Sequence, residues 1–418
     1  MKLNITHNFG WETLLMFSLW GGALRVLPIS KNIVWLIIFA ALGFSLILMS
    51  LKVISHGIKL PNRTAWFFFF MFIFFTWCLT TLMWSPIESD LLEIGDISML
   101  ITVVIPTLAI ALGASINPNF SKHWVMGVII VSFLIFMFIL PLKLTSSESI
   151  WMVLLEFDQD DMGGNYLLTG YALSSLCIIC FIRAYHSKKM RLLYLGISAI
   201  AFWLTLDLGG RAPVLASAIS IIVFTVFQLR NRFTIAPFIF LFSILMIPIV
   251  YGGVFLYQNM DLLAETIPFF LRFQADLVRD DLSELTSIGQ RIIWIDISRE
   301  LIAQNPIFGN GLLSWRQVGG LAYDETYPHN IVLDILCDLG VIGLILFLPI
   351  ILMTLQAAKS LLQYSDNIFD KLLATLFIYF LLLTLTSGYI YWDWIWVWMT
   401  AVIIARSHHE KNMLKNNN

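Results

Sequence analysis

Apolar runs long enough to cross a lipid bilayer recur along almost the whole chain, and they limit its fold more than any other feature. A membrane-spanning α-helix needs about 20 consecutive, mostly apolar residues. About twelve such stretches occur, near residues 12–29, 33–54, 65–84, 97–116, 123–141, 166–183, 191–206, 213–229, 234–257, 330–356, 371–386 and 389–405. Because the backbone in lipid must satisfy its own hydrogen bonds, we predict an all-α polytopic membrane protein with about twelve transmembrane helices.

Composition excludes the competing classes of protein. The chain has 418 residues, of which 59% are hydrophobic and 12% are charged, whereas soluble domains carry about 25% charged residues. The strands of membrane β-barrels alternate apolar and polar residues instead of staying apolar over a long run. A formal net charge of −2 gives no support to nucleic-acid binding.

Lysine and arginine are distributed unevenly between alternate loops, and this predicts the orientation. With a cytoplasmic N-terminus, most basic residues fall in loops on the inner side, as the positive-inside rule requires. Two short segments on the outer side are instead acidic, at residues 88–96 and 148–161. We therefore expect both termini in the cytoplasm.

One long segment divides the chain. Residues 1–257 contain the first nine predicted spans, residues 258–328 form a large outer loop, and residues 329–418 contain the last three spans and a cytoplasmic tail. Loops of this length in compact folds are usually functional or disordered.

The outer loop contains a predicted helix. Ser287 can cap a helix over about residues 290–304, and the following Asn305-Pro306 would end it. Three apolar residues fall on one face of this helix, namely Ile293, Ile297 and Leu301. Such an amphipathic helix is expected to lie on the membrane surface or to cap a cavity.

His329 is the only one of the seven histidines on the outer side of this topology. It lies in Tyr327-Pro328-His329-Asn330, where the large loop enters the tenth predicted span. Histidine titrates near neutral pH and is a common general base. The alternative is a residue at a helix start whose imidazole satisfies a backbone group.

Arg211 is a second candidate, at the outer end of a predicted hairpin. Gly209 and Gly210 allow a tight turn before it, and Pro213 suits the first turn of the next helix. A helix N-terminus beside a guanidinium group makes an anion site that suits phosphate. The alternative is an arginine that reaches toward lipid headgroups.

Arg291 is a third candidate, because it lies close to the positive N-terminal end of the predicted loop helix. A structural arginine would be more stable at the opposite end. Arg299 is a weaker candidate, since it can simply pair with Asp296 or Glu300.

Two further features have structural and functional interpretations. Gly309-Asn310-Gly311 is similar to a phosphate-binding turn, but it lacks the lysine that would follow in a nucleotide site, so we interpret it as structural. Asp334 and Asp338 lie one turn apart at the start of the tenth span. Acidic residues in a membrane segment suggest function, although near a helix N-terminus they can merely complement the dipole.

The residues between positions 289 and 343 form a recognisable series. It consists of Gly289-Gln290-Arg291, Trp294, Pro306, Gly309, Gly311, Tyr327-Pro328-His329-Asn330, Gly340 and Gly343. This series, with Gly210-Arg211 upstream, resembles the signature of the O-antigen ligase and O-antigen polymerase superfamily. The number of spans and the large outer loop before the histidine agree with that resemblance.

The resemblance implies a membrane glycosyltransferase of GT-C-like fold in the bacterial inner membrane, with its active site on the periplasmic face. Such an enzyme uses no nucleotide sugar, no metal and no other cofactor. Its donor is a glycan on undecaprenyl diphosphate, and its acceptor is a lipid-linked repeat unit or lipid A–core. Membrane lipid and a chain-length regulator are further expected partners.

The resemblance also assigns roles to residues. Arg211, Arg291 and His329 match the functional positions of the family, and Tyr327, Asn330 and Arg299 are expected to assist substrate binding. We expect the two arginines to hold the diphosphate and the histidine to accept the proton of the attacking hydroxyl. This hypothesis requires the three side chains to converge at the outer leaflet.

Several functions remain open at this point. Polymerase is the preferred activity within the family and ligase is the alternative. A transporter or flippase for lipid-linked sugars is a second alternative, although transporters often have repeated halves and this chain shows no obvious repeat. A membrane sensor with a ligand-binding loop would leave Arg211 unexplained.

Overall fold

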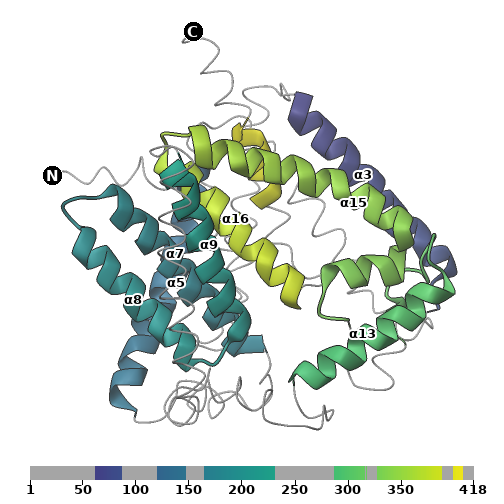
Figure 1. The fold of residues 1–418 in the computed structure, drawn as a ribbon, viewed down its shortest axis with the longest axis horizontal. Helices are drawn as coiled ribbons and strands as arrows, with labels where there is room; N and C mark the ends of the chain where they lie inside the picture. The colour runs from purple at the N-terminus through teal and green to yellow at the C-terminus, as the bar shows by residue number, and fades with distance from the viewer. Residues whose placement is uncertain are drawn as a thin grey trace, which may run out of the picture. The chain divides into compact units, whose positions relative to one another are not determined.

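The structure of the chain is a computed structural model that describes residues 62–86, 120–146, 164–230, 287–315, 317, 327–387 and 399–407. Every regular element in these ranges is a helix (Figure 1), so the all-α prediction is confirmed for them. In chain order the elements are α3 (Asn62–Thr81), the 3-10 helix η3 (Leu82–Trp84), α5 (Phe120–Thr145), α7 (Gly164–His186), α8 (Arg191–Asp207), α9 (Arg211–Arg230), α13 (Ser287–Gln304), α15 (Ile331–Tyr364) and α16 (Ile368–Ser387).

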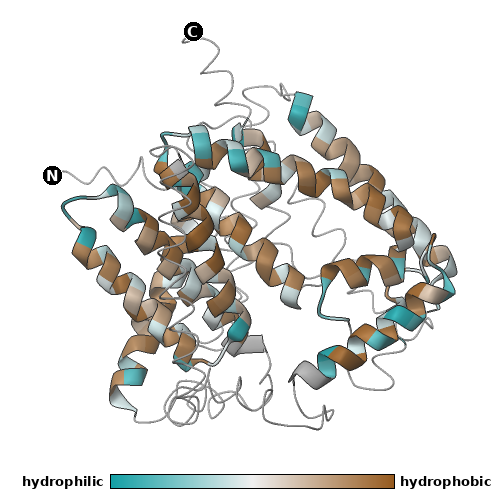
Figure 2. Ribbon diagram, viewed as in Figure 1, coloured by the Kyte–Doolittle hydropathy of each residue, from teal (hydrophilic) through white to brown (hydrophobic). Residues whose placement is uncertain are grey.

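Six stretches of the described helices are long and apolar enough to cross a membrane: Asn62–Trp84, Phe120–Thr145, Leu167–His186, Arg211–Leu229, Ile331–Tyr364 and Ile368–Thr386. Helix α8, with 17 residues, lies at the lower end of spanning length. Hydrophobic residues predominate along these helices in Figure 2. Together they coincide with seven of the predicted spans.

The other predicted spans lie outside the described residues. They are those near residues 12–29, 33–54, 97–116 and 234–257, and most of the last, near residues 389–405. The total of about twelve spans and the orientation therefore stay predictions.

Helix α13 confirms the helix predicted in the outer loop, with one correction. It begins at Ser287, three residues before the predicted start, and it ends at Gln304, where Asn305-Pro306 was expected to end it. The face predicted to be apolar is the one that is buried: Leu301 and the adjacent Trp294 are each 6% exposed, and Ile297 packs against them. Ile292 and Ile295, which lie off this face, are 38% and 43% exposed.

Helix α15 also differs from the single continuous span that the sequence predicts. Its backbone leaves the helical conformation at Gly340, where φ is 66° and ψ is −168°. A short segment over residues 331–339 is thus set at an angle to the longer segment over residues 341–364. The longer segment alone has enough residues to span a bilayer.

The described residues form two compact units. The first unit contains residues 122–146, 164–230 and 362–379, and the second contains residues 62–86, 120–121, 287–315, 317, 327–361, 380–387 and 399–407. Each unit is described by itself below.

Small and hydroxyl-bearing residues bring the helices of the first unit together. The Ser198 hydroxyl on α8 donates to the Cys177 carbonyl on α7 at 2.9 Å. The Ser174 hydroxyl on α7 donates to the Pro213 carbonyl on α9 at 3.3 Å. A Cβ atom on Gly170 would lie only 3.2 Å from the Pro213 ring. Close helix approach through small residues is typical of packing within membranes.

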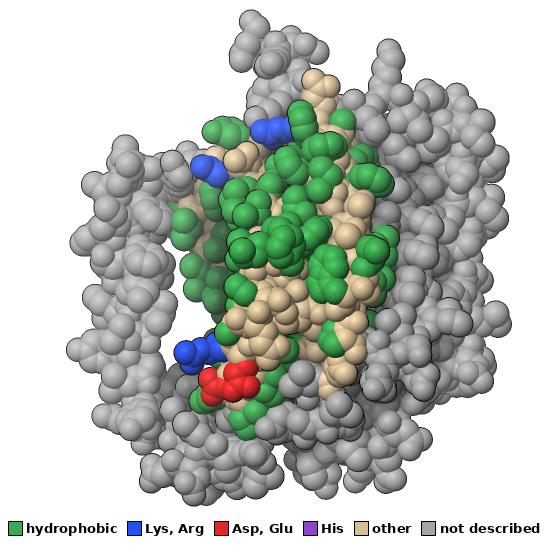
Figure 3. Space-filling model, turned by 90° about the vertical axis from the view of Figure 1, so that its right-hand side faces the viewer, with side chains coloured by type: hydrophobic (Ala, Val, Ile, Leu, Met, Phe, Trp, Pro, Cys, Tyr) green, Lys and Arg blue, Asp and Glu red, His purple; other side chains and the backbone are tan. Residues whose placement is uncertain are grey.

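Aromatic side chains join α3 to α15 in the second unit. The rings of Phe74 and Phe347 are 5.5 Å apart between centroids, and the Trp77 indole N–H donates to the Leu339 carbonyl at 3.0 Å. Large apolar side chains also point outward from α3, such as Phe72, which is 72% exposed. Figure 3 shows a face on which hydrophobic side chains cover the middle and charged ones lie toward the ends, the pattern expected of a lipid-facing surface.

Candidate active site

His329 lies in the second unit, immediately before α15, in a conformation that few residues adopt. Its φ angle is 53°, in the left-handed region that costs an L-residue roughly 1–2 kcal/mol. Such strain occurs preferentially at functional sites, where the surrounding structure enforces it. The residue is half-buried.

Two aromatic rings flank the His329 imidazole. The Trp294 ring, from α13, is 4.3 Å away between centroids and nearly parallel, with an interplanar angle of 17°. The Tyr327 ring is 4.1 Å away and tilted by 34°. The imidazole thus joins α13 to the segment that enters α15, although the two are far apart in the sequence.

Arg291 lies on the same helix as Trp294 and three residues before it. Residues with this spacing are neighbours on a helix surface. The Arg291 side chain is exposed and lies close to the N-terminal, positive end of α13. Arg291 is therefore one helical turn from the residue that stacks on His329, and its convergence with His329 stays a prediction.

A chain of hydrogen bonds behind the stacked rings links the backbone of Trp294 to the Trp315 side chain. The Ser298 hydroxyl donates to the Trp294 carbonyl at 2.7 Å, and the Trp315 indole N–H donates to the Ser298 hydroxyl at 3.1 Å. Trp294, Leu301, Trp315 and Cys337 form one buried apolar cluster. This cluster holds α13 against the short first segment of α15.

The segment after α13 replaces hydrogen bonds that α15 loses at Gly340. Residues on both sides of the break form backbone hydrogen bonds to residues 306–311. The four substitute bonds run from Asn310 N–H to the Cys337 carbonyl (2.9 Å), from Gly311 N–H to the Asp338 carbonyl (3.0 Å), from Val341 N–H to the Pro306 carbonyl (2.9 Å) and from Ile342 N–H to the Ile307 carbonyl (3.2 Å). Buried backbone groups are rarely left unpaired, so residues 306–311 and the break form together.

Glycine is required where these two segments cross. At Gly340 a Cβ atom would collide with the Ile307 carbonyl, and at Gly309, where φ is 75°, it would collide with the Asp338 carbonyl. The Asn310 side chain completes the crossing by donating to the Leu301 carbonyl at 2.7 Å. The structural interpretation of Gly309-Asn310-Gly311 is confirmed.

Asp338 has a specific structural role that its position in the sequence did not reveal. One carboxylate oxygen accepts the Leu313 N–H at 2.7 Å. The other accepts the Ser314 hydroxyl at 2.7 Å and the Trp315 N–H at 3.4 Å. The carboxylate, 1% exposed, thus organises the turn that leads to Trp315, instead of complementing the helix dipole.

Asn330 caps α15. Its side-chain oxygen accepts the N–H groups of Val332 and Leu333 at 2.9 and 3.2 Å, which is the usual role of an N-cap residue. Its amide donates to the Leu385 carbonyl on α16 at 3.0 Å. Asn330 and Tyr327 are thus next to the candidate base, and their contribution to substrate binding stays a prediction.

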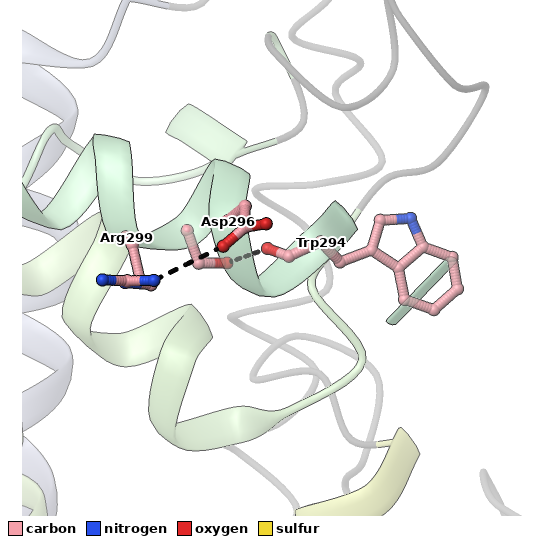
Figure 4. A network of polar contacts seen from close by, with 4 residues as sticks. Trp294, Asp296 and Arg299 are labelled. Carbon is pink, nitrogen blue, oxygen red and sulfur yellow. Dashed lines mark hydrogen bonds and ion pairs between the residues drawn. The ribbon is translucent and has the colours of Figure 1, made fainter. Parts of the chain in front are cut away.

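Arg299 is on the exposed side of α13, with its side chain 77% exposed and 3.6 Å from the Asp296 carboxylate. Figure 4 shows the Trp294 ring pointing away from this pair. The simpler interpretation of Arg299, an ion pair within one helix, accounts for its position. Its expected assistance in substrate binding stays a prediction.

Arg211 is the first residue of α9 in the first unit, and the predicted turn precedes it. Gly209 has a φ of 69°, and its N–H donates to the Leu206 carbonyl at 3.0 Å. Pro213 lies in the first turn of α9, as expected. Arg211 is half-buried. Its convergence with His329 and Arg291 stays a prediction.

A buried ion pair next to this turn was missed by the sequence analysis. The Lys143 ammonium is 3.1 Å from the Asp207 carboxylate, and both side chains are largely buried. Lys143 also lies 5.8 Å from the centre of the Trp203 ring, within the range of a cation–π contact. The sequence does contain a signal for this pair: Lys143 lies near the end of one apolar span and Asp207 near the end of another.

The described part of the chain contains no group of three or more histidine, cysteine, aspartate or glutamate side chains arranged to hold a metal ion.

The membrane-length helices define the class of protein: it is a helical integral membrane protein. Residues 196–348 match the protein family described as O-antigen ligase. The match covers a little more than a third of the chain and includes Arg211, Arg291 and His329. No curated protein matches the chain.

This match over residues 196–348 confirms the resemblance to the O-antigen ligase and polymerase superfamily. The match supports a function of the O-antigen ligase or polymerase type in general.

Proposed function

We propose that this protein is an inverting, metal-independent glycosyltransferase of the O-antigen polymerase type. It transfers a glycan from undecaprenyl diphosphate to a sugar hydroxyl of a second lipid-linked repeat unit. The reaction takes place at the periplasmic face of the inner membrane, with both termini in the cytoplasm. The observation that carries the proposal is the strained His329, which stacks against Trp294, and Trp294 lies one helical turn after Arg291 on α13.

His329 acts as the base in a single displacement. The acceptor hydroxyl oxygen forms a bond to the anomeric carbon while the bond from that carbon to the diphosphate oxygen breaks. The hydroxyl proton passes to a ring nitrogen of His329, and the bonding electron pair leaves with the diphosphate. One displacement inverts the anomeric configuration.

Arg211 and Arg291 bind the diphosphate. Each lies in the first turns of a helix, Arg211 as the first residue of α9 and Arg291 as the fifth of α13. A helix N-terminus adds N–H groups and a partial positive charge to the guanidinium charge. Both would stabilise the negative charge that develops on the leaving group.

The O-antigen ligase reaction is the second candidate, because the family that matches residues 196–348 is described by that name. It differs only in the acceptor, which would be lipid A–core. The product separates the two activities: a polymerase lengthens the glycan on the carrier lipid, whereas a ligase moves it to lipid A–core.

The broken helix α15 is the one observation that favours a transporter, since broken helices often form transport sites. In this chain, however, residues 306–311 bond the backbone groups that the break releases. The Asp338 carboxylate is likewise occupied by three donors. These groups hold the site together, which supports an enzyme more than a transporter.

Reconstitution in liposomes tests the proposal, with a purified undecaprenyl-diphosphate-linked oligosaccharide as donor and either acceptor. The informative variant is His329→Asn, because asparagine tolerates a left-handed backbone but cannot act as the base. We expect its turnover to fall at least about 100-fold while its melting temperature stays close to that of the wild type.

Two substitutions serve as controls in this assay. His409→Ala removes a histidine from the C-terminal tail, and Lys359→Ala removes an exposed cation from α15; both should leave turnover unchanged. Wild-type turnover by His329→Asn would refute the assignment of the base. Absence of transfer by the wild type to either acceptor, in folded and inserted protein, would refute the enzymatic function.

A further inference from the structure

We propose that Trp294 is a positioning residue: its ring fixes the plane of the His329 imidazole, so that a ring nitrogen faces the acceptor hydroxyl. The inference deepens the proposed function and rests on it. The distance of 4.3 Å and the angle of 17° between the two rings correspond to direct stacking.

Tyr327 restricts the same imidazole from a second side. Its ring is 4.1 Å from the imidazole, and two rings at such distances cannot both occupy one face of a five-membered ring. The imidazole is therefore held between Trp294 and Tyr327. Both faces of the imidazole are thus covered by aromatic rings.

The stacking ring is itself held rigidly. Trp294 is 6% exposed, and its carbonyl accepts the Ser298 hydroxyl. That hydroxyl in turn accepts the indole N–H of Trp315, and the Trp315 backbone N–H donates to the Asp338 carboxylate. The Trp294 side chain itself packs in the buried cluster with Leu301, Trp315 and Cys337, which joins α13 to the short first segment of α15, and His329 directly precedes that segment.

This arrangement controls the geometry of proton transfer. A general base must lie within hydrogen-bond reach of the proton that it accepts, and small misplacements of a catalytic group lower the rate strongly. An imidazole free to rotate would spend much of its time with its nitrogens directed elsewhere. Trp294 thus acts on the chemical step and not on donor binding.

Two substitutions at Trp294 distinguish the effect of losing the aromatic ring from the effect of a smaller side chain. Trp294→Phe makes the side chain smaller but keeps an aromatic face, whereas Trp294→Leu makes it smaller and removes that face. In the reconstituted assay, we expect Trp294→Leu to lower kcat about tenfold with KM for the lipid-linked donor unchanged within about twofold. Trp294→Phe should retain most of the wild-type kcat. Trp66→Leu, at an exposed tryptophan on α3, is the matched control and should retain wild-type turnover.

A chemical readout tests the positioning without relying on activity. Diethylpyrocarbonate modifies accessible imidazoles, and mass spectrometry can follow His329 with the exposed His186 as an internal reference. In Trp294→Leu the imidazole is no longer held in one orientation and its nitrogens can turn toward the reagent, so the rate of His329 modification should rise several-fold relative to His186. Trp294→Phe should leave this rate close to that of the wild type. This result is expected whether or not the protein transfers glycans, so it distinguishes a failure of the stacking from a failure of the proposed function.

The proposal is overturned if Trp294→Leu folds and keeps both wild-type kcat and wild-type His329 modification. It is also overturned if Trp294→Phe and Trp294→Leu lose turnover equally. Melting temperature and size-exclusion profile establish folding, and Trp294→Met replaces the leucine variant if that variant does not fold.

Discussion

Each of the two units is stabilised internally, and the kind of contact differs between them. In the first, α7, α8 and α9 keep their own backbone hydrogen bonds and meet through small residues and hydroxyl groups, such as Ser198 on Cys177. In the second, α15 is broken at Gly340, and residues 306–311 supply the partners that its backbone has lost. The contacts between the helices of the first unit are separate, so each can be lost alone. In the second unit, the break at Gly340 and the bonds to residues 306–311 depend on one another. Substitutions in the second unit should therefore be much more damaging.

The largest effect is expected from Gly340→Ala. The φ and ψ of Gly340, 66° and −168°, lie in a region that is essentially restricted to glycine, and the new Cβ would collide with the Ile307 carbonyl. Strain and overpacking together should destabilise the fold by roughly 3 kcal/mol or more. Thermal unfolding in detergent measures the loss.

Gly196→Ala on α8 is the matched substitution in the first unit. A Cβ at this position would meet no atom within 4 Å, and alanine is the better helix former by about 1 kcal/mol. This variant should unfold at the wild-type temperature or slightly above it. Equal destabilisation by the two substitutions would contradict the contrast between the units.

An intermediate effect is expected from Asp338→Asn. The amide cannot replace both carboxylate oxygens as acceptors for Leu313, Ser314 and Trp315. Loss of hydrogen bonds to a charged group should cost about 2 kcal/mol, seen as a lower midpoint of denaturant unfolding. Asp366→Asn, at an exposed position between α15 and α16, is the control. A midpoint for Asp338→Asn as high as that of this control would argue against the role of the carboxylate.

The smallest effect is expected in the first unit, from Ser198→Ala. This change removes one hydroxyl that bonds the Cys177 carbonyl across two helices. Hydrogen bonds between membrane helices contribute on average about 0.6 kcal/mol, so unfolding should shift only slightly. Thr80→Ala, whose hydroxyl bonds within its own helix at 2.7 Å, serves for comparison. If Ser198→Ala lowered the free energy of unfolding as much as Asp338→Asn, the proposed difference between the two units would be contradicted.

The sequence predicted the local features of the candidate site well. The turn at Gly209, the start of α9 with Pro213 in its first turn, and the end of α13 before Asn305 all follow from the preferences of one or two residues. The interpretation of Arg299 as a partner of Asp296 also follows from spacing along one helix. Such features are short-range, and for that reason they can be read from the chain.

The sequence did not predict the break in α15 or the role of Asp338. An apolar run with a glycine inside it is compatible with a continuous helix, and what ends the helix at Gly340 is a competing set of donors and acceptors from residues 306–311. The stacking of Trp294 on His329 was equally out of reach. Both depend on contacts between residues that are about thirty positions apart in the chain, and no local preference encodes them.

The sequence by itself determined that this chain is a helical membrane protein, because twenty-residue apolar runs leave the backbone in lipid no other way to satisfy its hydrogen bonds. It also pointed to His329, Arg291 and Arg211 as the candidate chemical groups, through their residue types and their motif. Only the tertiary structure decided how His329 is held, since the orientation of an imidazole depends on the rings and hydrogen bonds that surround it in space.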